Sequence, residues 1–219
     1  MQEVICTVDV VLLTLREGVL QVLLHRRERE PFAGTLALPG GYVHTDSDRD
    51  TRDAALRVLR DKPGVHSPYL EQLATFSGPA RDPRGWSISV AYYALVPDTL
   101  VTEAADAVLC PVDDLRGVPF DHAQIVASAV QRVRNKSSYS SLPVHVCQEP
   151  FTLPQLQAVY EALLGESLNK VSFRRKMDEL DVLEAIPGVF SSGSAHRPAQ
   201  LYRVKPAWRH ALSLSERAI

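Results

Sequence analysis

The stretch LPGGYVHTDSDRDTRDAALRVLRDKPGV, residues 38–65, decides how this chain folds. Two adjacent glycines end an apolar segment, an acidic loop follows, and apolar residues then recur at helical spacing as far as Gly64. Glycine permits a tight turn, and apolar residues spaced three and four apart fall on one face of a helix. We therefore expect a strand, a glycine turn and an amphipathic helix in that order.

The order of residues in this stretch resembles the signature of the Nudix family, G-x5-E-x7-R-E-U-x-E-E-x-G-U with U aliphatic. The matching parts are the LPGG run, Ala54-Ala55, Arg57-x-Leu59 and Gly64-Val65. In that family the helix carries glutamates that hold a divalent metal over a substrate diphosphate. Helix positions i, i+3 and i+4 share one face, so carboxylates there bind Mg²⁺ or Mn²⁺ together. The resemblance implies an N-terminal α/β/α sandwich with a mixed sheet.

The metal-binding part of the signature is degenerate in this chain. Alignment on Gly64 places Val58, Asp61 and Lys62 at three of the glutamate positions, and of these only Asp61 carries a carboxylate. Gly41 and Gly64 are 23 positions apart, two more than in the family pattern, and the upstream glutamate is missing. We therefore predict no catalytic residue and no metal site, and we expect that no cofactor is required.

Composition indicates a soluble globular protein of one large or two ordinary domains, with 219 residues, 45% of them hydrophobic and 23% charged. No apolar run approaches the ~20 residues that span a bilayer, and the first residues have no signal-peptide pattern. The three cysteines are scattered without a C-x-x-C motif, which argues against a disulfide framework or a zinc site. We expect a cytoplasmic protein with no membrane partner.

The net charge of −2 is unevenly distributed along the chain. Residues 1–135 sum to −4, whereas residues 136–219 sum to +2. A basic excess in one part of a chain favours an anionic partner for that part.

The N-terminal part reads as a hairpin over residues 4–15 and 19–25, followed after residue 65 by two strands and a closing helix over residues 122–134. Arg26 and Arg27 leave the hairpin where a Nudix fold has its ligand cleft, although a solvated strand end explains them equally well. The loop of residues 77–85 resembles the ADP-ribose-handling branch of the family and adds Arg81 and Arg84 as phosphate or ribose contacts. Asp121 and His122 suit a helix cap and first turn.

Beyond residue 135 the pattern changes. Residues 136–150 are predicted to be a linker with a short strand over residues 144–147. Thr152 then caps a helix that ends at Gly165, and a second helix starts near Asn169 with Phe173, Met177 and Leu180 on its apolar face. Two strands, over residues 182–185 and 200–204, flank a wing over residues 187–198 that is rich in Pro, Gly and Ser.

This second unit, residues 151–210, predicts a winged helix-turn-helix. On the second helix Arg175 lies opposite the apolar face, Ser172 and Arg174 flank it, and Lys176 lies to one side. A helix that presents basic and polar residues from its first turns suits the recognition element of such a fold. An ordinary solvated basic face is the alternative. The predicted DNA-binding residues are Asn169, Lys170, Ser172, Arg174, Arg175, Lys176 and, in the wing, His196 and Arg197.

Taken end to end, the chain is similar to the NrtR family of Nudix-related transcriptional regulators. The similarity covers the Nudix part and also residues 151–162, 173–176 and 197–203. It implies an α+β protein in which residues 1–135 bind ADP-ribose as an effector and residues 151–210 bind operator DNA. It also implies a homodimer that represses NAD biosynthesis or salvage genes and leaves DNA when ADP-ribose binds.

Within that interpretation the effector-binding residues are Arg26, Arg27, Gly41, Lys62, Arg81 and Arg84. One rival is an ADP-ribose pyrophosphatase with an accessory domain, in which Asp61 and Asp46, Asp48, Asp50 or Asp53 form an irregular metal site. A second rival is a non-catalytic protein whose C-terminal unit binds another protein.

Overall fold

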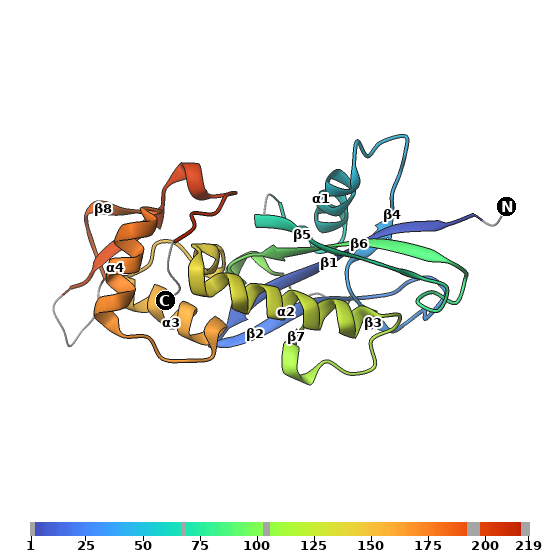
Figure 1. Ribbon diagram of the computed structural model, residues 1–219, viewed down its shortest axis with the longest axis horizontal. Helices are drawn as coiled ribbons and strands as arrows, with labels where there is room; N and C mark the ends of the chain where they lie inside the picture. The colour runs from blue at the N-terminus through green and yellow to red at the C-terminus, as the bar shows by residue number, and fades with distance from the viewer. Residues whose placement is uncertain (1–2, 67–68, 103–105, 192–197, 216–219) are drawn as a thin grey trace.

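A computed structural model describes residues 3–66, 69–102, 106–191 and 198–215 of the chain. Its larger part is a mixed sheet with one helix on each face, and its smaller part is a pair of helices beside a two-stranded sheet (Figure 1). Both predicted folds, the α/β/α sandwich and the winged helix-turn-helix, are confirmed. No helix among the described residues is both long and apolar enough to cross a membrane.

The central sheet has seven strands in the order β3-β2-β1-β6-β5, with β4 paired to β1 and β7 paired to β2. The strands are β1 (Ile5–Arg16), β2 (Val19–Arg26), β3 (Leu36–Ala37), β4 (Gly40–Tyr42), β5 (Tyr69–Gly78), β6 (Ser87–Leu95) and β7 (Ala107–Pro111). Strands β1 and β2 form the predicted antiparallel hairpin, and β1 runs parallel to β6.

The two faces of the sheet are covered by α1 (Thr51–Asp61) and α2 (His122–Tyr139). Successive side chains of a strand point to opposite faces, and β1 follows this rule. Val8, Val10 and Leu12 pack in the cluster that contains α1, whereas Val11 and Leu13 pack in the cluster that contains α2. The near-continuous apolar run of β1 is therefore that of a strand covered on both sides.

The winged helix consists of α3 (Leu153–Leu164), α4 (Lys170–Leu180), β8 (Leu183–Phe190) and β9 (Gln200–Val204). Thr152 caps α3 in a capping box with Gln155, and Gly165 ends that helix with a φ of 78°, as the sequence predicted. Phe173, Met177 and Leu180 are buried in the core of this unit. Strand β8 extends five residues beyond the predicted strand end and includes the start of the predicted wing.

The segment between the two units differs from the prediction. Helix α2 continues to Tyr139, and the predicted strand over residues 144–147 is wrong, because Leu142–Val146 forms the 3-10 helix η3. Residues 140–147 are buried, so this segment packs between the units. The other 3-10 helices are η1 (Asp98–Leu100), η2 (Val112–Asp114) and η4 (Pro206–Trp208).

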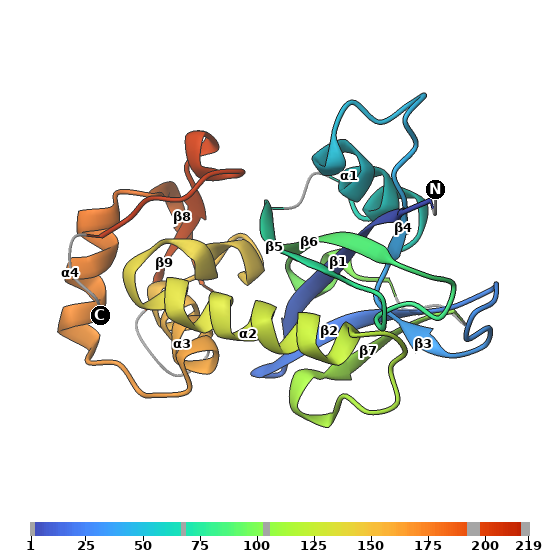
Figure 2. The ribbon, with the colours of Figure 1, turned by 45° about the vertical axis from the view of Figure 1, so that its right-hand side comes forward.

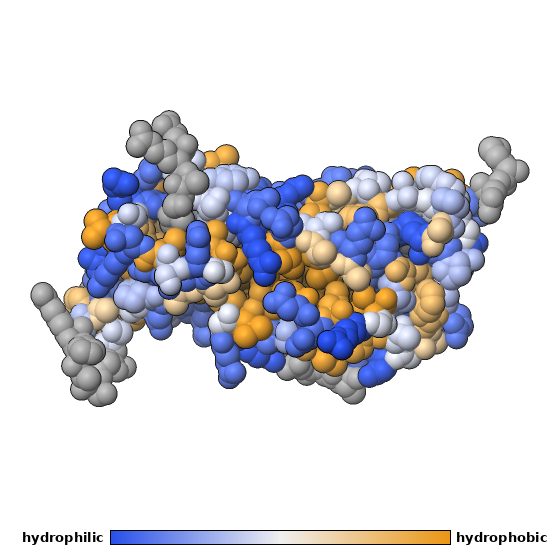
Figure 3. All heavy atoms as spheres, turned by 60° about the horizontal axis from the view of Figure 1, so that its bottom comes forward, coloured by the Kyte–Doolittle hydropathy of each residue, from blue (hydrophilic) through white to orange (hydrophobic). Residues whose placement is uncertain are grey.

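Helix α2 joins the two parts of the molecule. Figures 1 and 2 both show it running along the sheet and ending beside the winged helix, where it packs on α3. On the face seen in Figure 3, hydrophobic residues gather over the middle of the molecule, whereas the winged-helix end is largely hydrophilic.

Candidate functional site

A cleft of about 690 Å³ opens beside the glycine turn, a volume typical of small-molecule sites. It is bounded by the first half of β1, the end of β2, the turn into β4, the C-terminal end of α1, the loop after β5 and the start of α2. All six residues predicted to bind the effector line this one cleft: Arg26, Arg27, Gly41, Lys62, Arg81 and Arg84. The fold thus brings together residues that are as far as 58 positions apart in the chain.

The two glycines are required by close contacts on both sides of the turn. A Cβ atom at Gly40 would lie 2.3 Å from Oδ1 of Asp9 and 2.9 Å from the carbonyl oxygen of Val8. A Cβ atom at Gly41 would lie 3.3 Å from Cγ2 of Val58. The turn therefore brings its backbone, including the Gly40 carbonyl, to the surface of the cleft.

Asp9 is a buried carboxylate in the wall of the cleft. The backbone N–H of Leu38 donates to Nδ1 of His122 at 3.0 Å, so the ring proton lies on Nε2, 3.5 Å from Oδ1 of Asp9. The Ser89 hydroxyl donates to Oδ2 at 2.6 Å. Burial by itself raises the pKa of Asp9, but His122, Ser89 and Arg81 together outweigh burial and hold this pKa below its ordinary value.

Three arginines that line the cleft are neutralised by carboxylates. Each donates through two nitrogens, at 2.6 to 3.0 Å: Arg57 to Asp48, Arg81 to Asp121 and Arg84 to Asp82. The hydrogen bonds from Arg57 hold the pKa of Asp48 far below its ordinary value. Because their charges are already matched, these arginines shape the cleft, and they are less suited to bind a phosphate than the prediction assumed for Arg81 and Arg84.

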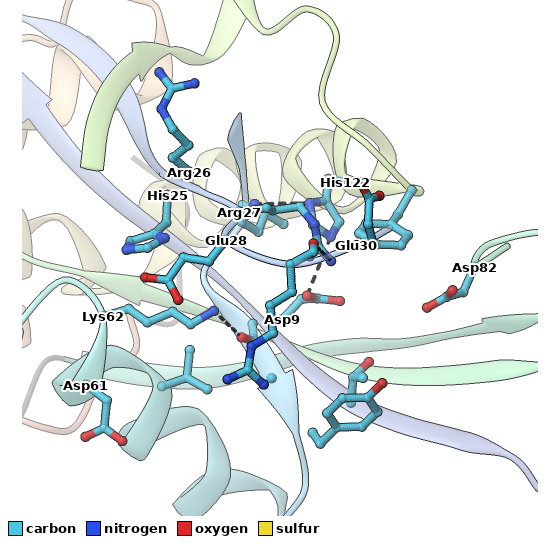
Figure 4. A pocket seen from close by; sticks show the side chains of 18 of the residues that line it. Asp9, His25, Arg26, Arg27, Glu28, Glu30, Asp61, Lys62, Asp82 and His122 are labelled. Carbon is cyan, nitrogen blue, oxygen red and sulfur yellow. Dashed lines mark hydrogen bonds and ion pairs between the residues drawn. The ribbon is translucent and has the colours of Figure 1, made fainter. Parts of the chain in front are cut away.

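Three other cations of the cleft donate only to neutral carbonyl oxygens. Arg26 donates to Gly34 at 2.6 Å, Arg27 to Pro31 at 2.8 Å, and Lys62 to Gly40 at 2.7 Å. The Arg27 guanidinium also stacks over the ring of Phe120, 4.8 Å from its centroid. Within the described ranges none of the three forms an ion pair with a carboxylate. All three line the cleft, and Lys62 points into it near Glu28 (Figure 4). Asp9 and Glu28 contribute negative charge near Lys62, and Asp82, Asp9 and Glu30 do so near Arg27, so the charge of these two cations is partly compensated without such a pair.

The carboxylates near α1 do not assemble into a metal site. Asp61 is half exposed and pairs with Arg60 at 3.0 Å, Asp53 pairs with Arg49, and Asp50 caps the helix. In the part of the chain that the structure describes, no three His, Cys, Asp or Glu side chains gather closely enough to hold a metal ion. The geometry gives no support to the irregular metal site of the hydrolase alternative.

A second basic surface lies on the outer face of α4. Lys170, Ser172, Arg174 and Arg175 are exposed, and no ion pair of these residues is found among the described residues. The side chain of Asn169 accepts hydrogen bonds from the N–H groups of Val171 and Ser172 and so caps the helix. The two predicted wing residues, His196 and Arg197, lie outside the described residues.

Lys176 does not lie on the DNA-binding face, where the sequence predicted it. Its side chain is only 4% exposed, and its ammonium donates to the carbonyl oxygen of Ser138. Ser138 is in the last turn of α2, where carbonyl groups lack partners within the helix. Lys176 therefore binds α4 to α2 and does not share the exposed face with Arg174 and Arg175.

Asp9 was not among the residues predicted from the sequence, and Asp121 has a different role from the predicted helix cap. Asp121 does stand at the start of α2, but its side chain makes no capping bond and instead accepts from Arg81. Its neighbour His122 faces Asp9 and does not merely fill a helical turn. Asp9 is the one charged residue in the apolar run of residues 4–15. A lone charge in an apolar strand is the signal in the sequence that could have identified it.

Comparison with known proteins follows the same division of the chain. Residues 143–204 match the family described as "NrtR DNA-binding winged helix domain". Over 203 residues the chain is 38% identical to the "ADPR responsive transcriptional repressor NtrR" of Acinetobacter baylyi, which covers 90% of this chain and 80% of that protein.

Two solved structures of Shewanella oneidensis NrtR are similar to this one. The complex with a 27mer DNA has a TM-score of 0.90 at 37% identity and covers 98% of this chain and 99% of that chain. The NUDIX domain complexed with ADP ribose has a TM-score of 0.56 at 36% identity, with 60% of this chain and 90% of that chain covered.

Proposed function

The chain belongs to the NrtR family, and from this premise we propose that it is a DNA-binding transcriptional repressor that leaves its operator when its Nudix domain binds ADP-ribose. The genes that it represses are those of NAD biosynthesis or salvage. We further propose that residues 1–135 bind the effector, residues 151–210 bind DNA, and residues 136–150 connect them. The protein acts in the cytoplasm and needs no cofactor.

The observation that carries this proposal is the distribution of positive charge that is not held in an ion pair among the described residues. Such charge gathers in two places, the cleft with Arg27 and Lys62 and the outer face of α4 with Arg174 and Arg175. A diphosphate suits the first place because a cleft of about 690 Å³ has the volume of a small-molecule site. The phosphates of duplex DNA suit the second because α4 is the exposed second helix of a helix-turn-helix.

The degenerate signature supports binding without cleavage. Hydrolysis of a diphosphate in this fold needs a divalent metal to polarise the phosphoryl group and to generate the attacking hydroxide. Val58 and Lys62 provide no ligand for such a metal, and Asp61 is paired with Arg60. A sensor benefits from this loss because turnover would destroy its own signal.

A homodimer is part of the proposal. Two winged helices related by twofold symmetry would meet a palindromic operator with half-sites ~34–36 Å apart or a multiple of that distance. The hydrophobic residues in the middle of the face in Figure 3 support a subunit contact there. Light scattering in solution measures the mass and hence the number of subunits.

Helix α2 is the physical connection that we propose between the two sites. Its first residue, His122, faces Asp9 in the cleft, and the carbonyl of Ser138 in its last turn accepts from Lys176 of α4. An 18-residue helix is about 27 Å long and moves as a rigid element. Ligand contacts that shift its first turn would therefore change the position of α4, provided that the ligand prefers one of the two arrangements.

The test is a gel-shift titration of the protein on its own upstream DNA with and without ADP-ribose. We expect a shifted band that disappears as ADP-ribose is added, and an unrelated DNA of equal length serves as the control. Retention of the complex at saturating ADP-ribose would rule out the effector role.

Incubation of ADP-ribose with the protein and Mg²⁺ or Mn²⁺ separates the repressor from the hydrolase alternative. Release of AMP at ~1 per second or faster, an ordinary enzymatic rate, would favour the hydrolase. We expect no turnover at such a rate.

A further inference from the structure

At the metal-binding positions of the Nudix signature, this chain has an aliphatic and a basic side chain where the pattern has glutamates. Of the three helix positions that carry glutamates in the pattern, Val58 is 2% exposed and packs in the core below Gly41. Asp61 is exposed and paired with Arg60. These side chains do not fit a divalent cation, which needs several oxygen ligands around one point.

Lys62 occupies the third position and points into the cleft (Figure 4). It follows the last residue of α1, and its ammonium donates to the Gly40 carbonyl at 2.7 Å. An ammonium has three hydrogens, so two of them remain available after this bond. The Gly40 bond fixes the cation beside the glycine turn, the element that lies next to the substrate diphosphate in the family pattern.

Charged groups of both signs lie around Lys62. Partial burial and the neighbouring positive charge of Arg27 lower the pKa of Lys62, whereas Asp9 and Glu28 act in the opposite direction. The positive charges of Lys62 and Arg27 therefore repel each other. A diphosphate placed between them would relieve this repulsion and hydrogen-bond to both.

We propose that the Lys62 ammonium takes the electrostatic place of the divalent cation, so that the diphosphate of the effector binds without any metal. This inference rests on the proposed function, since it concerns how the same ligand is held. A fixed ammonium neutralises phosphate charge, but unlike a metal it carries no bound water to be activated. Lys62 thus supports binding of the diphosphate, and together with Val58 it removes ligands that a metal would need for cleavage.

The experiment is a calorimetric titration of the full chain with ADP-ribose, in EDTA and again in millimolar Mg²⁺. We expect the Kd of the unchanged protein to agree within about 2-fold between the two buffers. Lys62→Gln should weaken binding by about 10- to 100-fold in both buffers, the range for loss of a charge-assisted hydrogen bond. Lys62→Glu should weaken binding in EDTA more than Lys62→Gln does, because it places a negative charge against the diphosphate.

Two variants make the result specific. Lys62→Arg keeps the charge and should bind within a few-fold of the unchanged protein. Arg52→Gln removes a charge from an exposed position of the same helix outside the cleft and should leave the Kd unchanged. The thermal melting temperature of each variant verifies that it is folded.

The proposal is overturned if the unchanged protein binds at least 10-fold more tightly in Mg²⁺ than in EDTA, or if Lys62→Gln binds as the unchanged protein does. Absence of ADP-ribose binding in both buffers would instead reject the proposed function itself, and the role of Lys62 with it.

Discussion

In the cleft, Arg57, Arg81 and Arg84 each donate to a carboxylate at 3.0 Å or less, whereas Arg174 and Arg175 on α4 extend into solvent with no such partner within the described ranges. The residue type is the same in both regions. The number of arginines in a region therefore does not identify a site for an anion.

The difference between the two regions lies in the matching of charge. A guanidinium held by a carboxylate is already satisfied, and its main effect is on the shape and stability of the fold. A guanidinium or ammonium that meets only water or a neutral carbonyl keeps its charge available for a ligand. By this criterion Arg26, Arg27 and Lys62 resemble the arginines of α4 more than they resemble their neighbours in the cleft.

Replacement of Arg81 tests the structural side of this comparison and has the largest expected effect. Arg81→Ala would leave Asp9 and Asp121 close together without their shared cation, at a site where the Arg81 side chain is 8% exposed. We expect the free energy of unfolding to fall by about 3 kcal/mol, measured by urea denaturation.

Arg26→Ala is the matched control in the same cleft. Its guanidinium is exposed and bonded to a carbonyl, so the stability loss should be below about 0.5 kcal/mol. Equal losses in the two variants would show that carboxylate pairing does not separate the two classes.

Replacement of both Arg174 and Arg175 by alanine tests whether arginines without an ion-pair partner bind the anionic ligand, here DNA. We expect operator affinity to fall by about 100-fold, and the slope of log K against log salt to lose about 1.8 units for two phosphate contacts. Stability should be unchanged because both side chains are exposed. Fluorescence anisotropy at several salt concentrations measures the affinity and the slope together.

Lys176→Met is the control next to them in sequence, with the opposite expected profile. Methionine keeps the buried aliphatic part and removes the bond to Ser138, so stability should fall by about 1 kcal/mol. The salt slope of DNA binding should not change. A reduced slope in Lys176→Met would place this lysine on the DNA after all.

His145 extends the comparison to a basic side chain that is buried and bonded to a neutral carbonyl group. It stacks on Tyr69, bonds to the Ala211 carbonyl, and burial lowers its pKa to about 4. The unfolded chain, with a histidine pKa near 6.5, binds a proton more readily than the folded protein between these values. Stability from this group is therefore complete above pH 6.5 and is lost as the pH falls toward 4.

At pH 5 this loss should reach about 2 kcal/mol relative to pH 7.5. Urea denaturation of the unchanged protein and of His145→Gln at both pH values measures it, since carboxylates titrate in both proteins and cancel in the difference. The same pH dependence in both proteins would contradict the assignment to His145.

Local signals in the sequence were sufficient for much of the fold. The β1-β2 hairpin, the glycine turn, and α3 with its cap at Thr152 and its end at Gly165 each depend on residues a few positions apart. The strand predicted over residues 144–147 failed because its apolar residues are buried by packing between two units, and burial of a short apolar run does not distinguish a strand from a 3-10 helix.

The sequence by itself determined that the signature had lost its metal ligands, since the identity of Val58 and Lys62 is independent of any contact. It also determined that a basic helix-turn-helix follows the Nudix domain. Only the tertiary structure decided which cations are paired with a carboxylate and which donate to a carbonyl group. Arg81 meets Asp121 forty positions away, and Lys176 meets Ser138 thirty-eight positions away. Electrostatic interactions depend on distance in space, and chain folding sets that distance with little regard to separation in sequence.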